Sequence, residues 1–189
     1  VKTKLEAIKG LRALVEKGEL ENAVRDYIAE KPYLLNPKWE TFKVEISVKH
    51  ILDEAAGEAK LTEDEYEGER KRVDLALRSG EHLLIVEFMQ PGKSLDWDHI
   101  TRCKRYVHLI RNKVRLLTEL GIEKVTGLIV ADRLEKRPDV LQEIIDLSNN
   151  GVYAYDWETL LSQSERTWRE YLDILGGRAP EDERIRNIK

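Results

Sequence analysis

A chain of 189 residues fits one domain with room for a small N-terminal addition, and it is long enough to bury a hydrophobic core. Hydrophobic residues make up 41% of the chain and charged residues 36%, which is typical of a soluble, heavily charged globular protein. The net charge of -4 excludes a bulk attraction to nucleic acid, so any nucleic-acid surface has to be a local patch.

The composition also bears on the compartment. Cys103 is the single cysteine, so no internal disulfide can form, and we expect a reducing, cytoplasmic environment. No apolar run approaches the roughly 18 residues of a membrane span, so no membrane contact is expected. The chain begins with Val1 rather than methionine, which is compatible with a piece of a longer protein.

The first third of the chain predicts two helices, a strand and an acidic connection. Apolar residues at helical spacing predict a helix over 3–17, within an N-terminal unit spanning 1–18, and a second helix over 19–30. Strict alternation of apolar and polar residues predicts a half-buried strand over 42–52. Residues 53–70 carry eight acidic side chains and are expected to form an exposed connection, with a functional acidic segment as the alternative.

The rest of the chain alternates between short apolar runs and amphipathic segments. Two strands, 71–78 and 82–88, are separated by Ser79-Gly80, a pair that suits a tight hairpin turn. The pattern beyond predicts a helix over 97–120, a strand over 124–131, a helix over 138–148, a strand over 152–155, a helix over 157–175 that Gly176-Gly177 ends, and a charged tail over 176–189. This order predicts an α/β fold with a mixed sheet flanked by helices.

Two carboxylates stand inside the apolar hairpin. Asp74 and Glu87 lie in strands that would otherwise be fully buried, and a buried charge is costly unless it is paired or binds metal. A two-residue turn at Ser79-Gly80 places Asp74 across from Ile85, with Glu87 as its diagonal neighbour on the same face. A four-residue loop puts the two carboxylates directly opposite each other, whereas a three-residue loop separates them.

Converging carboxylates at a sheet end predict a site for Mg²⁺ or Mn²⁺, ions that prefer oxygen ligands. Such an ion polarises a phosphodiester and activates a water molecule. The structural alternative is that Asp74 pairs with Arg72 or Arg78.

The predicted helix after the hairpin is rich in basic residues. Its position next to the carboxylates suits contacts with phosphates. The alternative is a solvated helix that forms salt bridges with the acidic residues of 53–70. The candidate nucleic-acid-binding residues are Arg102, Lys104, Arg105, His108, Arg111 and Arg115.

The segments R-V-D-L-A-L and I-V-E-F-M resemble the D…(D/E)-x-K core of the PD-(D/E)xK nuclease superfamily. The wider pattern, with E-L-E-N-A-V-R-D-Y-I-A-E-K-P-Y-L-L before it and V-E-F-M-Q-P-G-K-S-L-D-W-D-H within it, is similar to the Shedu-type branch, found alone or appended to GHKL ATPases. The resemblance covers Glu19 to Tyr155. It implies a restriction-endonuclease-like domain over 19–175 that binds DNA, a role in defence, and an ATPase domain or self-association as open options.

The resemblance assigns roles residue by residue. Asp74 and Glu87 match the two metal ligands, and Glu21 matches a glutamate that many members add from a helix, with Glu45 as a weaker candidate. The motif lysine is replaced by Met89, which has neither a proton to give nor a charge.

Two nearby side chains, Gln90 and Lys93, are the candidates for the polar group that the motif lysine would supply. The expected function is therefore a metal-dependent nuclease whose catalytic residues are Asp74, Glu87, Gln90 and Lys93. The alternative is a catalytically degenerate nuclease fold that binds nucleic acid or protein within a larger assembly.

Overall fold

The computed structural model describes residues 2–19, 21–36, 38–47, 72–112, 118, 121–134 and 137–178. Its elements are α1 (Lys2–Glu16), α2 (Glu21–Glu30), a 3-10 helix η1 (Pro32–Leu34), β1 (Glu40–Ser47), β2 (Arg72–Ser79), β3 (His82–Phe88), α4 (Trp97–Arg111), β4 (Lys124–Ala131), α6 (Pro138–Asn149), β5 (Val152–Asp156) and α7 (Trp157–Arg178).

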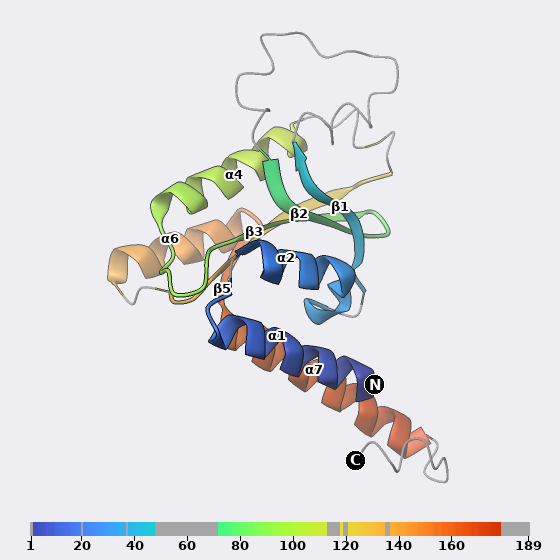
Figure 1. Cartoon of the computed structure of the whole chain (residues 1–189). Helices are drawn as coiled ribbons and strands as arrows, with labels where there is room; N and C mark the ends of the chain where they lie inside the picture. Colours follow the sequence, from blue (N-terminus) through green and yellow to red (C-terminus); the bar gives the residue numbers. More distant parts are fainter. Residues whose placement is uncertain are drawn as a thin grey trace.

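The strands form one mixed sheet in the order β1-β2-β3-β4-β5. The first three strands are antiparallel neighbours, and β3, β4 and β5 run parallel. Parallel neighbours need long crossover connections, and the segments that contain α4 and α6 supply them. Helices lie on both sides of the sheet (Figure 1), which confirms the predicted α/β class with a mixed sheet flanked by helices.

Each face of the sheet has its own apolar core. Ile85, Ile100 and Cys103 belong to the core beneath α4, where the free thiol of Cys103 is buried. Alternate residues of the strands point to the other face, where Phe88 stacks on Trp157 of α7 with ring centroids 5.8 Å apart. Buried residues of α1 join this second core, so α1 packs as part of the same domain.

Close packing holds α4 against β4. A Cβ atom at Gly127 would lie 2.7 Å from Cys103 Sγ and 2.9 Å from Val107 Cγ2. Real Cβ atoms do not make contacts this short, so only glycine permits this approach. Because Cys103 of α4 packs against Gly127 of β4, the preceding residue, Arg102, lies beside β3.

The hairpin turn lies one residue later than predicted. Ser79 pairs with His82, so the turn residues are Gly80 and Glu81 rather than Ser79-Gly80. Gly80 has a φ of 58°, a left-handed conformation that glycine adopts without steric cost. The requirement for positive φ at Gly80 therefore sets the turn.

Two helix ends also differ from the predictions. α4 ends at Arg111, where Asn112 forms its C-cap and donates its backbone N–H to His108 O, and most of the predicted continuation to 120 lies outside the described residues. α7 runs through Gly176 and Gly177 to Arg178, so these glycines do not end the helix.

Three predicted features lie outside the described residues: the strand beyond Ser47, the acidic connection over 53–70 and the tail beyond Arg178. Among the helices that the structure does describe, none combines the length and the apolar character needed to cross a membrane.

Candidate functional site

The candidate site lies where β2 parts from β3. The antiparallel ladder ends at the pair Leu75–Val86, whereas β3 continues alongside β4 as far as Phe88. Continuing this register by one residue puts Asp74 directly opposite Glu87. The register predicted from a turn at Ser79-Gly80, with Asp74 across from Ile85, is therefore wrong, and the placement is the one predicted for a four-residue loop.

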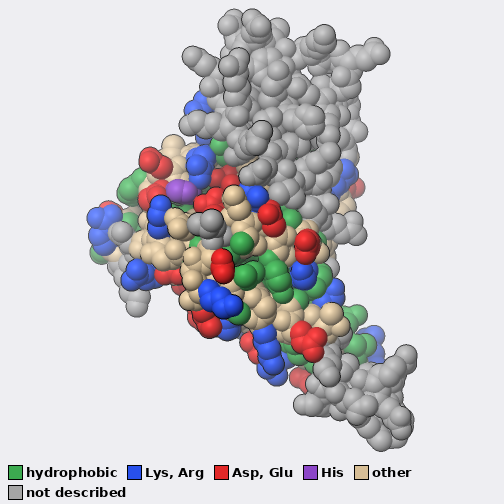
Figure 2. Space-filling model, viewed as in Figure 1, with side chains coloured by type: hydrophobic (Ala, Val, Ile, Leu, Met, Phe, Trp, Pro, Cys, Tyr) green, Lys and Arg blue, Asp and Glu red, His purple; other side chains and the backbone are tan. Residues whose placement is uncertain are grey.

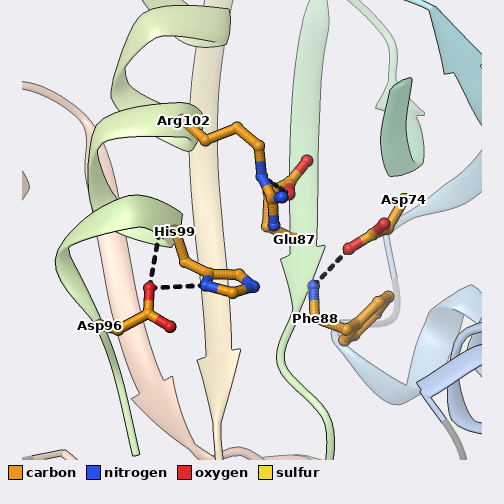
Figure 3. A network of polar contacts seen from close by, with 6 residues as sticks. All are labelled: Asp74, Glu87, Phe88, Asp96, His99 and Arg102. Atoms are coloured by element: carbon orange, nitrogen blue, oxygen red, sulfur yellow. Dashed lines mark hydrogen bonds and ion pairs between the residues drawn. The ribbon is translucent and has the colours of Figure 1, made fainter. Parts of the chain in front are cut away.

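Asp74 bridges the point at which the strands separate. Its Oδ2 accepts a hydrogen bond of 2.7 Å from the backbone N–H of Phe88 (Figure 3). This carboxylate thus satisfies a buried main-chain donor in the gap between β2 and β3. The contact anchors one end of the candidate pair to the backbone of β3.

Glu87 faces α4 and meets Arg102. Arg102 Nε lies 2.8 Å from Glu87 Oε2, and Figure 3 shows the guanidinium reaching across to the carboxylate from α4. The contact is an ion pair. The Glu87 side chain is 1% exposed and the Arg102 side chain is 36% exposed. Glu87 Oε1 is buried and has no hydrogen-bond partner among the described residues.

The carboxylates share one electrostatic field. The pKa of Glu87 is raised to about 8, chiefly by burial and also by the charge of Asp74, while Arg102 acts to lower it. Burial also raises the pKa of Asp74, against the Phe88 N–H and the charge of Arg102. A site of this kind favours the uptake of a proton or of an additional cation.

Glu21 approaches from α2. Burial raises the pKa of Glu21, and the charge of Asp74 raises it further, so the two carboxylates repel each other electrostatically. No three His, Cys, Asp or Glu side chains of the described residues are grouped closely enough to hold a metal ion together. Glu21 therefore contributes to the field at Asp74 without forming a three-carboxylate cluster. Glu45 lies in β1, but its side chain lies outside the described part of the structure.

Asp96 caps the start of α4. Asp96 Oδ1 accepts from the backbone N–H of His99 at 2.8 Å and lies 2.6 Å from His99 Nδ1 (Figure 3). This N-cap holds the first turn of the helix, and with it His99, whose charge acts on both Asp74 and Glu21.

The replacements proposed for the motif lysine are placed differently. Met89 is 1% exposed and belongs to the core beneath α4, and its backbone N–H donates to Val130 O at 2.8 Å. Gln90 is half-buried and Lys93 is exposed. Among the described residues, Asp74 Oδ2 meets the Phe88 N–H and Glu87 Oε2 meets Arg102, so the cation beside Glu87 is Arg102 and neither Gln90 nor Lys93. Sequence reasoning placed Arg102 on the basic face and missed this contact.

The basic residues of α4 have diverse surroundings. Arg111 donates from Nε and Nη2 to Val125 O and from Nη1 to Asn150 O, so its guanidinium ties α4 to β4 and to the end of α6. Lys104 pairs with Glu143 of α6 at 3.3 Å. Arg115 lies outside the described residues.

A groove of about 390 Å³ runs along the basic side of α4. Lys104, Arg105 and His108 are exposed along it. On the face seen in Figure 2, acidic and basic side chains are interspersed, so positive charge is local rather than spread over one surface. The remaining lining residues of the groove are Thr101, Val107, Arg111, Asn150 and Val152.

Comparison with known proteins gives little further guidance. No protein-family model matches the chain, and no curated protein matches it. A solved structure of an EndoMS–dsDNA2 complex is similar with a TM-score of 0.42 and 17% identity, over 69% of this chain and 41% of that one. The chain thus spans less than half of the protein it matches, and its function has to be inferred from the geometry of its own site.

Proposed function

We propose that this chain is a nucleic-acid-binding domain in which Asp74 and Glu87 hold Mg²⁺ or Mn²⁺ and hydrolyse phosphodiester bonds in DNA. The observation that carries the proposal is a pair of carboxylates opposite each other, Glu87 buried and Asp74 half-buried, of which Glu87 alone forms an ion pair with Arg102 among the described residues. A structural salt bridge to Arg102 requires one carboxylate. A second one in the same field raises the cost of burial without adding a contact to Arg102.

The donor set fits a hard divalent cation. Glu87 Oε1 is a buried carboxylate oxygen outside the ion pair with Arg102, and it would serve as a ligand atom in the proposed site. Mg²⁺ keeps several waters and is commonly bound by one or two carboxylates, so a third protein ligand is not required. When bound, such an ion would polarise the phosphodiester and lower the pKa of a water molecule.

Arg102 is the residue of this chain that best substitutes for the motif lysine. Its guanidinium is always charged, lies beside Glu87 and is exposed enough to reach a ligand. Guanidinium groups bind phosphate oxygens through paired, charge-assisted hydrogen bonds. Arg102 would favour the ionised form of Glu87 and hold the phosphate, a role that Met89 in the core beneath α4 cannot perform.

The groove along α4 supplies a surface for the nucleic-acid backbone. Lys104, Arg105 and His108 line it in the half of α4 that follows Arg102. Contacts between such cations and phosphates release counterions, so binding should weaken steeply with salt. Because Arg111 is committed to main-chain carbonyls, we assign it to holding α4 in place.

A second function is favoured by the burial of Met89. A methionine that fills the core at the motif lysine is also what a nuclease fold would contain after losing catalysis. The chain would then bind nucleic acid through the same groove without cleaving it.

Cleavage of supercoiled plasmid with Mg²⁺ or Mn²⁺ separates the two functions. We expect the wild-type protein to nick DNA and Asp74→Asn to lose on the order of 100-fold in rate, because a metal ligand is lost. Asn keeps the size of the side chain, and Arg105→Gln serves as a control that should weaken binding without abolishing cleavage.

The opposite result identifies the second function. If no divalent ion supports cleavage by the wild-type protein, while DNA binding still weakens with salt, the domain is a binding module. A gain of cleavage in Met89→Lys, but not in Met89→Leu, would then show that the missing lysine is the cause. If the wild-type protein neither cleaves nor binds DNA, both functions are contradicted.

A further inference from the structure

A second pocket opens on the opposite side of the sheet, at the other end of β3. It has a volume of about 280 Å³ and lies on the face that α7 covers. Its floor comes from three adjacent strands, with Leu84 of β3, Thr126 and Leu128 of β4, and Tyr153 and Tyr155 of β5. It is separated from Glu87 by most of the length of β3, so it is a distinct site.

Aromatic side chains form much of its wall. Trp39 and His82 pack edge to face with ring centroids 4.8 Å apart, and both line the pocket. Tyr153 is 38% exposed, which is unusual for a large side chain on the face of a sheet that a helix partly covers. Trp39 is only 7% exposed, so the exposed aromatic side chain of the pocket is Tyr153, which lies beside the apolar side chains of the floor.

Two lysines give the pocket a positive charge. Lys38 and Lys124 are exposed lining residues, and neither forms an ion pair with another described residue. Lys38 Nζ lies 4.8 Å from the centroid of the Trp39 ring, so its charge is directed at the aromatic wall. Burial and the charges of both lysines lower the pKa of His82 to about 4, which shows that their field reaches the interior of the pocket.

Polar groups lie among the apolar ones. His82 Nε2 and Thr126 Oγ1 form a hydrogen bond of 2.8 Å, so the imidazole is held in place by the floor. Gln163 of α7 lines the pocket with an amide that both donates and accepts hydrogen bonds. These groups can recognise the edge of a planar heterocycle but are not needed by a purely apolar ligand.

We infer that this pocket binds a nucleoside phosphate, with the base against the exposed ring of Tyr153 and the phosphate at Lys38 and Lys124. Bases of every kind stack on aromatic side chains, and lysine binds phosphate as a compact charge. The volume lies at the small end for ligand sites, which suits one base with one phosphate. An apolar ligand would leave both lysines unused, and a simple anion would not use the aromatic wall.

The nucleoside phosphate has two sources, a free nucleotide or one residue of a single strand. Titration of adenosine, cytidine, guanosine and uridine monophosphates, followed by tryptophan fluorescence and calorimetry, tests the first source. A short single-stranded DNA of mixed sequence tests the second. Binding of uridine reports the contribution of base stacking to the affinity, and binding of inorganic phosphate reports the contribution of charge.

Tyr153→Ala and Lys124→Gln are the informative variants, because both side chains are exposed and their removal should spare the fold. We expect each to weaken nucleotide binding by about tenfold or more, with Lys124→Gln leaving the weak binding of uridine unchanged. The matched control is Tyr171→Ala, which removes an exposed tyrosine that lies on α7 and outside the pocket. This variant should bind nucleotide as the wild-type protein does.

Binding of either the nucleotide or the oligonucleotide to the wild-type protein, together with its loss in Tyr153→Ala, supports the site. Which of the two binds identifies the source of the nucleoside phosphate. Failure of both to bind at millimolar concentration, or equal binding by Tyr153→Ala and the wild-type protein, would overturn it. Asp74→Asn should bind nucleotide normally, so the result is independent of whether the chain cleaves DNA.

Discussion

Replacing Glu87 with glutamine is expected to stabilise the folded protein at alkaline pH, although the residue lies at the centre of the proposed metal site. Burial raises the pKa of Glu87 to about 8, against a usual value of 4.5. Between these values the folded state holds a proton that the unfolded state has lost, so this group lowers the stability as the pH rises. Glutamine keeps the shape and does not ionise, and we expect a gain of roughly 2 kcal/mol at pH 9.

The groups around Glu87 come from three elements and set the size of this effect. Asp74 of β2 raises the pKa of Glu87, Arg102 of α4 lowers it, and Glu21 of α2 acts on Asp74. Urea unfolding of the wild-type protein and Glu87→Gln at pH 5, 7 and 9 should show a difference in unfolding free energy that grows with pH. Glu81→Gln, an exposed position in the turn, is the control. A difference that stays constant, or that shrinks as the pH rises, would contradict the assignment.

Removing Arg102 is expected to have the opposite effect. In Arg102→Met, the ion pair to Glu87 is lost, while the repulsion between Glu87 and Asp74 remains. Breaking a fully buried pair costs about 3–5 kcal/mol, and because Arg102 is partly exposed we expect roughly 2 kcal/mol at pH 8. Adding Mn²⁺ should restore part of this loss, since an ion that binds only the folded state stabilises it.

The matched control is Arg105→Met, an exposed position on the same helix, which should change the stability little. The double variant Arg102→Met, Glu87→Gln should recover most of the lost stability, because the uncompensated charge is gone. Equal stability of Arg102→Met and the wild-type protein at pH 8, with the same response to Mn²⁺, would show that Arg102 does not compensate the carboxylates.

Local patterns were sufficient to predict most of the fold. Alternation and helical spacing depend on which face of an element is buried, and they led to the mixed sheet and its flanking helices. They also drew attention to Asp74 and Glu87, because a carboxylate inside an apolar strand breaks the pattern. The hairpin register was wrong because it depends on the backbone conformation of Gly80, which residue types alone do not determine.

The contacts of long side chains could not be predicted from the sequence. Arg102 and Arg111 lie on one helix, and the sequence alone does not distinguish their contacts. Arg102 nevertheless pairs with a buried carboxylate, whereas Arg111 donates to main-chain carbonyls. Such contacts depend on tertiary packing, which includes the close approach of α4 to Gly127. Glycine within a strand pattern, opposite a helix seam that carries Cys103, is the signal that could have indicated it.

Calorimetric titration of Mn²⁺ at pH 8, where competition from protons is weaker, tests the central claim most directly. We predict that the wild-type protein binds Mn²⁺ at a site that is lost in both Asp74→Asn and Glu87→Gln and kept in Arg105→Gln. Unchanged Mn²⁺ binding in either carboxylate variant, or no binding by the wild-type protein, would contradict a metal site at this pair.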